Sequence, residues 1–409
     1  MALAVILGLL SVNAIASSET GIGKGPLPGL AGSAAAANNA QTTYTNPAGM
    51  SRLEGTQKMF QFVYAHGEHD SSTEITGLNI KTEGFDTSDI FAPTGYYVRP
   101  LNERWKIGFS VIAPAGFGDD YGSSDARRYI AKEWDLFYLA LNSSISYRVS
   151  DKLSLGATVV LNYSAYDLES DVLNLETPGT NDGKMELEAD GISASFNLGM
   201  LYEFSDQTRV GVVYRSEVES ELEGDPDYSG LDTTTLDLVS QLGLENLDVE
   251  IEGTLPAVLQ AGLYHRFDNQ SAFTVDIALV DFSEFVLTEF NVFAGTILNR
   301  QPKYDDILAG SIGYSFPLGS KYTIGTSRGY LESPVDKDER SFLFRIDEAM
   351  LFGLGVSWET SNPHGITINF DYIKVKDGRI ETPTLPIVDR LISDHDNHDV
   401  LIVDFMYCW

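Results

Sequence analysis

The last residues of the chain, NHDVLIVDFMYCW (397–409), decide the fold class. Read with a period of two, one face carries only large apolar side chains: Leu401, Val403, Phe405, Tyr407 and Trp409. The same split recurs at 152–166, 349–358 and 365–373, where the opposite face is rich in Gly, Ser, Thr and Asn. A soluble β-sandwich also alternates, but its outer face would carry Lys and Glu. An apolar outside and a small, polar inside indicate a membrane β-barrel.

The connections between the predicted strands differ in length by parity. Every second connection is short: Asn102-Glu103, Ser150-Asp151, Ser205-Asp206, Asp268-Asn269, Leu318-Gly319 and Ser361-Asn362-Pro363. The others are long, polar and acidic: 68–89, 116–132, 169–186, 224–247, 290–303, 332–346 and 378–396. Short turns on one side and long loops on the other are typical of bacterial outer-membrane barrels. We therefore predict an all-β fold in which residues 55–409 form a 14-stranded antiparallel transmembrane β-barrel.

Composition and charge exclude several classes of function. The 409-residue chain has 27 basic and 59 acidic side chains, a formal net charge of −32, and so lacks the basic surface that nucleic acids require. The single cysteine, Cys408, excludes an internal disulfide. The sequence contains no GxSxG, P-loop or dinucleotide-binding motif, so we expect no catalytic residue and no cofactor. Residues 394–399 carry ligand-type side chains without the spacing of a known site, so we expect a solvated loop and no metal there.

The chain begins with a predicted export signal. Residues 2–12 are almost wholly apolar, and Ala14-Ile15-Ala16 gives the small-x-small pattern of a cleavage site, so we expect residues 1–16 to be a signal peptide. Beyond it, no charge-free stretch of 18 residues is predominantly apolar, as a transmembrane helix would need to be. Export combined with this strand pattern predicts the outer membrane of a Gram-negative bacterium as the location.

Two neighbouring motifs near the N-terminus resemble those of a known family. The small-residue run GLAGSAAAANNA (29–40) is followed by YTNPAGM (44–50). Together they resemble the FadL family of outer-membrane transporters of long-chain fatty acids and hydrocarbons, and the resemblance extends over essentially the whole chain. It implies a monomer that takes up long-chain fatty acids or other hydrophobic small molecules passively. The C-terminal aromatic residues Phe405, Tyr407 and Trp409 also resemble the signal by which the barrel-assembly machinery recognises its clients.

The resemblance further implies that residues 17–54 form an N-terminal hatch that plugs the barrel lumen. This segment is too rich in small residues to build a core of its own and too uncharged to be a solvated tail. The hatch motif is Asn46, Pro47, Ala48 and Gly49. Pro47 keeps Asn46 out of the α region, and the Asn side chain can bond nearby backbone groups. Taken alone, these four residues also fit a plain turn.

The third predicted strand, 104–115, contains a proline near its end. Proline cannot donate to a β-ladder, so Pro114, followed by Gly116, Phe117 and Gly118, indicates a local break in pairing. In the FadL family the third strand kinks inward beside the hatch and opens a hole in the wall. The resemblance therefore implies ligand-gated hatch movement and lateral release of the substrate at this kink. The alternative is that Pro114 simply ends the strand at the rim.

A period of two places Arg215 in the lumen, on the same face as Glu217, Glu219 and Glu221. There it could bind the carboxylate of a fatty acid. It could equally pair with those glutamates or with backbone carbonyls of the hatch.

The long loops would face the cell exterior. We expect loops 169–186 and 224–247 to form an outer capture surface, with a short amphipathic helix at 234–246. The acidic loops could share divalent cations with the phosphates of lipopolysaccharide and other outer-membrane lipids. Two other functions stay open for the barrel: a general porin for polar solutes, and an enzyme or adhesin.

Overall fold

The computed structural model describes residues 32–76, 80–129, 131–178, 181–244, 249–287, 289–293, 296–300, 303–336, 340, 347–361, 364–381 and 391–409. The predicted signal peptide, 1–16, and residues 17–31 of the predicted hatch lie outside these described residues.

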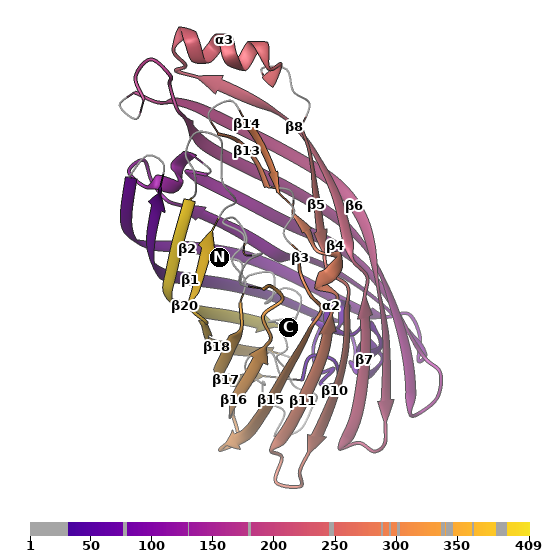
Figure 1. The fold of residues 1–409 in the computed structure, drawn as a ribbon. Helices are drawn as coiled ribbons and strands as arrows, with labels where there is room; N and C mark the ends of the chain where they lie inside the picture. The colour runs from indigo at the N-terminus through magenta and orange to yellow at the C-terminus, as the bar shows by residue number, and fades with distance from the viewer. Residues whose placement is uncertain are drawn as a thin grey trace.

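The described strands form one closed antiparallel barrel (Figure 1). Its wall contains 18 strand segments, and four pairs of them (β7/β8, β9/β10, β11/β12 and β18/β19) are single strands with a short interruption, which gives the 14 predicted strands. The barrel closes where β1 pairs with both β2 and β20. The bounds are β1 Gln57–Ile75, β2 Ile80–Pro100, β3 Trp105–Asp120, β4 Glu133–Arg148, β5 Leu153–Val172, β6 Gly183–Glu203, β7 Thr208–Arg215, β8 Val218–Ser229, β9 Val249–Leu255, β10 Val258–Arg266, β11 Ala272–Val280, β12 Val286–Leu287, β15 Ile307–Leu318, β16 Tyr322–Leu331, β17 Ala349–Ser361, β18 His364–Val375, β19 Gly378–Glu381 and β20 Leu391–Cys408. A separate hairpin joins β13 (Glu289–Phe293) and β14 (Thr296–Arg300).

The two faces of the wall differ as the period of two predicts. Phe405 on β20 and Trp409 just after it are 38% and 37% exposed, whereas Ile402 and Met406 on the opposite face are each 1% exposed. The outward face of the other strands is likewise apolar and exposed, for example at Ile192, Val159 and Leu354. A chain of this pattern can satisfy every backbone hydrogen bond within the wall while it presents apolar side chains to lipid.

The strands run further into the predicted loops than the sequence indicated. β1 extends to Ile75 and β2 begins at Ile80, so most of the predicted loop 68–89 is a β-hairpin. Similarly, β8 runs to Ser229. Polar side chains on these extensions suit strands that stand in water above the membrane, where hydropathy cannot distinguish strand from loop. At the outer end, helix α3 (Thr233–Gln241) lies above β8 and is shorter than the predicted helix 234–246 (Figure 1).

The predicted solvated loop at 394–399 is instead part of β20, which is a correction to the sequence analysis. His395 and His398 are both buried, and their ring centroids lie 5.2 and 5.4 Å from that of His69 on β1. A register shift between Glu68 and Asp70 brings the three rings together. Among the described residues, no group of three or more His, Cys, Asp or Glu side chains is arranged to hold a metal ion. Of the helices in this part of the chain, none has both the length and the apolar character needed to cross a membrane.

Candidate functional site

Residues 32–53 are packed against the inward face of the barrel wall. They contain helix α2 (Thr42–Thr45) and the 3-10 helix η1 (Pro47–Arg52), which contact β3, β4, β5 and β6. Alanine is frequent in this segment, and Ala34, Ala35 and Ala48 are completely buried. Small side chains let the backbone itself approach the wall, so its carbonyl and N–H groups can reach side chains of the strands.

The predicted hatch motif forms the junction between α2 and η1. Asn46 is extended, and its side chain caps η1 by accepting a hydrogen bond of 3.1 Å from the Ala48 backbone N–H. Its Nδ2 donates to the carbonyl oxygens of Ala34 (2.6 Å) and Met200 on β6 (3.2 Å). Pro47 occupies the first position of η1, where no backbone N–H is needed. The motif is therefore a capped turn that also ties two parts of the segment to the wall.

Three glycines on the inward face leave room for this backbone. A Cβ atom at Gly156 would overlap the Ala48 backbone nitrogen, and one at Gly199 would overlap the Asn46 side chain. A Cβ atom at Gly211 would overlap the Ala34 carbonyl oxygen. The sequence analysis did not single out these positions. In the sequence, these positions differ from others only in being glycines on the inward side of alternating strands. That feature does not by itself predict what packs against them.

A ring of inward-facing basic side chains holds the carbonyl groups of the segment. Arg209 donates to the Ala35 carbonyl oxygen at 2.7 Å, and Arg148 donates to that of Ser51 at 2.6 Å. Lys106 donates to the Leu53 carbonyl oxygen. Hydrogen bonds from a charged donor are stronger than those between neutral groups, so this ring holds the segment firmly in place. The sequence analysis missed these three residues because any inward cation on a barrel strand would look the same.

Near the start of the described segment, the carboxylate of Asp276 on β11 accepts hydrogen bonds from the backbone N–H groups of Gly32 and Ala34. It also accepts from Gln260 Nε2 at 3.2 Å. Along residues 32–53, a carboxylate of the wall thus accepts hydrogen bonds from backbone N–H groups, and basic side chains of the wall donate to backbone carbonyl groups.

Arg215 is inward and buried, as predicted, but its neighbours are not the predicted ones. A break between β7 and β8 at residues 216–217 shifts the alternation, so Glu219 and Glu221 are exposed on the outward face. Arg215 Nη2 donates to the Thr45 carbonyl oxygen (3.1 Å) and Nη1 donates to Gln260 Oε1 (3.2 Å). Its guanidinium also lies 5.2 Å from the centre of the Tyr44 ring. Of the two alternatives to ligand binding, pairing with a carbonyl of the N-terminal segment is therefore the one observed.

A small cavity brings together two predicted site residues, Pro114 and Arg215, and a residue next to the predicted hatch motif, Tyr44. Tyr44 of α2, Pro114 of β3 and Arg215 of β7 all line it. Asn162, Asn197 and the apolar residues Val160, Val218 and Leu255 complete much of its surface. Its volume is about 40 Å³, which is enough for water but about a tenth of an ordinary ligand pocket.

Beside this cavity, β2 and β3 separate. Their ladder runs from Pro100–Lys106 to Gly95–Val111, and beyond that pair the described residues of the two strands form no further ladder. Strand β3 continues as far as Asp120 and is paired there only with β4, with a register shift between Ile112 and Ala115. Because the strand extends beyond Pro114, the alternative that Pro114 ends it is wrong. The side chain of Ile90 on β2 reaches across, with its Cδ1 3.7 Å from where a Cβ of Gly116 would lie. The side chain of Phe117 lies outside the part of the chain that the structure describes.

The comparisons with known proteins agree with this architecture. The family model of the outer membrane protein transport proteins (OMPP1/FadL/TodX) matches residues 11–401. The chain belongs to this family. It is similar to a 47 kDa outer membrane protein of Pasteurella multocida, with 25% identity over 95% of this chain and 94% of the relative. It is also similar to a long-chain fatty acid transport protein of Escherichia coli, with 23% identity over 91% and 90% of the two chains.

The structural comparison shows the same fold. The crystal structure of a Pseudomonas aeruginosa FadL homologue superposes with a TM-score of 0.79 at 16% identity, covering 90% of this chain and 94% of the homologue. The family model and the sequence relatives confirm the predicted family and outer-membrane location, and the structural likeness confirms the predicted barrel fold.

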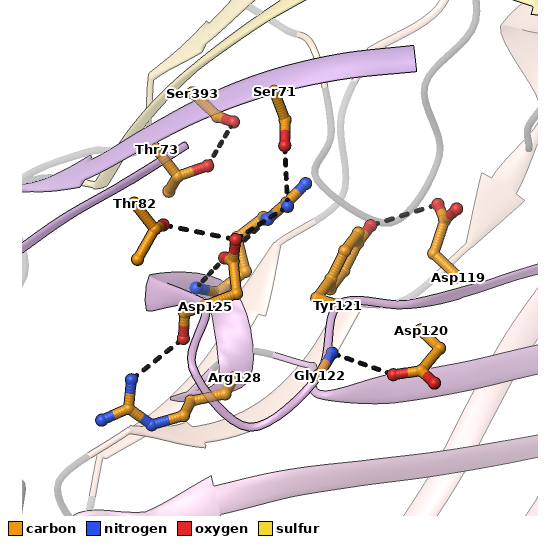
Figure 2. A network of polar contacts seen from close by, with 11 residues as sticks. Ser71, Thr73, Thr82, Asp119, Asp120, Tyr121, Gly122, Asp125, Arg128 and Ser393 are labelled. Carbon is orange, nitrogen blue, oxygen red and sulfur yellow. Dashed lines mark hydrogen bonds and ion pairs between the residues drawn. The ribbon is translucent and has the colours of Figure 1, made fainter. Parts of the chain in front are cut away.

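In this member of the family, a network of polar contacts joins the loop after β3 to β1 and β2 (Figure 2). Asp125 accepts hydrogen bonds from Thr82 on β2 (3.2 Å) and from the buried Arg127 (2.8 Å), which in turn donates to Ser71 on β1 (3.0 Å). Burial and the hydrogen bond to Asp182 raise the pKa of Tyr129 to about 12, so its hydroxyl stays protonated and donates at neutral pH. This network joins β1 and β2 to the β3–β4 loop although β2 and β3 have separated below it.

Proposed function

We propose that the protein takes up long-chain fatty acids or other hydrophobic compounds across the outer membrane by passive, ligand-gated diffusion. Residues 17–54 act as a hatch, and the substrate leaves sideways between β2 and β3. One observation carries the proposal: Tyr44, Pro114 and Arg215 line a single cavity beside the place where the β2–β3 ladder ends.

The size of the cavity supports gating rather than a permanently open channel. About 40 Å³ cannot hold a long acyl chain, so binding requires the surrounding groups to move. Arg215 of the cavity donates both to Gln260 on β10 and to the Thr45 carbonyl of α2, so the N-terminal segment is one of its partners. A ligand carboxylate that binds Arg215 competes with this carbonyl, and it favours the state in which the N-terminal segment has moved away.

Lateral exit follows from the cost of exposing an acyl chain to water. Each methylene that leaves an apolar environment for water costs about 0.8 kcal/mol. A path from the cavity through the wall keeps the chain in apolar surroundings. The loss of the ladder beyond Gly95 and Val111 means that no backbone hydrogen bonds between β2 and β3 need to break there.

The remaining expectations stay part of the proposal. The protein acts as a monomer without catalytic activity, and its C-terminal residues Phe405, Tyr407 and Trp409 recruit the assembly machinery. The acidic loops meet lipopolysaccharide at the outer surface. A general porin is disfavoured because residues 32–53 occupy the inner face of the wall.

An Arg215→Gln variant tests the carboxylate role. Loss of a charge-assisted hydrogen bond worth about 1.5–3 kcal/mol predicts a roughly tenfold or larger fall in saturable uptake of a labelled fatty acid. Uptake of the fatty alcohol of equal length should change less than about twofold. Arg148→Gln is the matched control, since Arg148 also donates to a carbonyl of the N-terminal segment (Ser51) and does not line the cavity. If the ratio of fatty-acid uptake to fatty-alcohol uptake is the same in Arg215→Gln and wild type, the proposed role of Arg215 is refuted. Steady conductance of small ions through the reconstituted protein would favour a porin.

A further inference from the structure

Arg328 is an outward-facing arginine within the apolar, lipid-facing belt of the barrel. It lies on β16, and its ladder partners are Ile312 on β15 and Phe352 on β17. The aromatic pair Tyr322–Trp358 marks the short-turn end of the same strands. Arg328 lies six residues further along, which is roughly 20 Å of strand or about 15 Å of height at a tilt of about 40°. It therefore belongs to the outer half of a belt about 25 Å tall.

The guanidinium group of Arg328 has aromatic and sulfur neighbours but no carboxylate. It lies 5.5 Å from the centre of the Phe352 ring, and its Nη2 is 3.9 Å from Met350 Sδ. Within the described residues no acidic side chain pairs with it. By contrast, Lys374 on β18, one outward position nearer the loops, lies 3.7 Å from Asp399. An unpaired arginine facing lipid destabilises a barrel, most at mid-membrane and less towards the interface.

A groove on the outward face runs beside this arginine. Its volume is about 540 Å³, and its lining includes Ile277, Leu308, Gly310, Ile312, Tyr330 and Met350. Gly310 stands between Ile277 and Tyr330 across the three strands, and its missing side chain produces the depression. Glu332 at the rim accepts a hydrogen bond of 2.9 Å from the Leu308 backbone N–H, and among the described residues no ion pair joins it to Arg328.

We propose that this groove binds a phosphorylated glycolipid of the outer leaflet, of the lipid A class. Its phosphate would bind the guanidinium of Arg328, and one acyl chain would lie in the groove. Guanidinium and phosphate form strong, often bidentate hydrogen bonds, so the lipid supplies the anion that the wall lacks. Arginine stacked on an aromatic ring is also held in an orientation suited to such a contact. The site lies on the opposite face of the wall from the cavity at Arg215, so it does not depend on the proposed transport function.

Native mass spectrometry of the full-length protein in detergent tests the site. The probes are bis-phosphorylated lipid A, the same lipid without phosphates, and inorganic phosphate. Arg328→Gln should weaken lipid A binding roughly tenfold or more, and Arg328→Lys should weaken it less because the charge remains. Lys374→Gln is the matched control, because it removes an outward cation that already has a carboxylate partner, and it should leave binding within about twofold. Removal of the phosphates should reduce binding to wild-type protein as much as Arg328→Gln does.

Several outcomes would overturn the proposal. Equal binding of lipid A to wild type and Arg328→Gln, or equal binding of the dephosphorylated lipid, removes the role of the guanidinium–phosphate contact. Displacement of lipid A by millimolar inorganic phosphate indicates a site for the free ion. A dimer that dissociates on Arg328→Gln indicates that a second copy of the chain fills the groove. Heat-modifiable migration on gels confirms that each variant is folded, and Arg328→Lys carries the comparison if Arg328→Gln does not assemble.

Discussion

Replacing Asn46 with alanine should loosen the N-terminal segment without affecting the barrel wall. The side chain makes three hydrogen bonds: to the Ala34 carbonyl (2.6 Å), the Met200 carbonyl (3.2 Å) and the Ala48 N–H (3.1 Å). At about 1 kcal/mol each, their loss shifts the equilibrium between closed and displaced segment by about 3 kcal/mol, or roughly 100-fold.

Hydrogen exchange of the purified protein, followed by mass spectrometry, measures this shift. Backbone amides of residues 34–53 should lose roughly 100-fold of protection in Asn46→Ala, whereas amides of the strands should keep theirs. Asn46→Asp retains the acceptor for Ala48 but places a carboxylate oxygen against the Ala34 and Met200 carbonyls, so it should reduce protection at least as much as Asn46→Ala does.

Asn102→Ala is the control, since the Asn102 side chain makes similar bonds, to the Arg104 and Trp105 N–H groups, in an exposed short turn. If residues 34–53 are as strongly protected from exchange in Asn46→Ala as in wild type, the conclusion that Asn46 holds the segment in place is refuted. Loss of protection throughout the strands would mean that the residue stabilises the whole barrel instead.

Two further predictions concern the wall. A cysteine pair at Ile90 and Gly116, in a Cys408→Ser background, should be bridged by a short bifunctional thiol reagent, because Ile90 already reaches Gly116, and uptake of a labelled fatty acid should fall to background. The control pair at Gly95 and Val111 joins strands that are already paired and should leave uptake unchanged; full uptake through the bridged Ile90–Gly116 pair contradicts lateral exit. Gly211→Ala should destabilise the folded barrel by about 1–3 kcal/mol in heat-modifiability assays, since its Cβ overlaps the Ala34 carbonyl. Gly95→Ala, with open space around the new Cβ, should have little effect, and equal melting of the two variants would contradict the tight seat at Gly211.

Much of the candidate site could be predicted from sequence, but its contacts could not. Period two correctly placed Arg215 inward, because β7 is regular up to that residue. It failed for Glu219 and Glu221, because a break of two residues at Ser216 and Glu217 reverses the alternation and leaves no clear mark in the sequence. The sequence predicts a loop where β1 and β2 have polar extensions, because strands that stand in water lack the apolar face that distinguishes a strand from a loop.

The order of residues along the chain is enough to predict the barrel, its 14 strands and the end that carries the long loops. These properties follow from local alternation and from the spacing of turns, and both are written along the chain. The folded chain was needed to show that Tyr44, Pro114 and Arg215 share a cavity and that β2 and β3 separate beside it. It was also needed to show that Arg209 and Asp276 bind the N-terminal segment. Closing a barrel brings together residues far apart in the chain, and the partner of each inward side chain depends on the register of every strand between them.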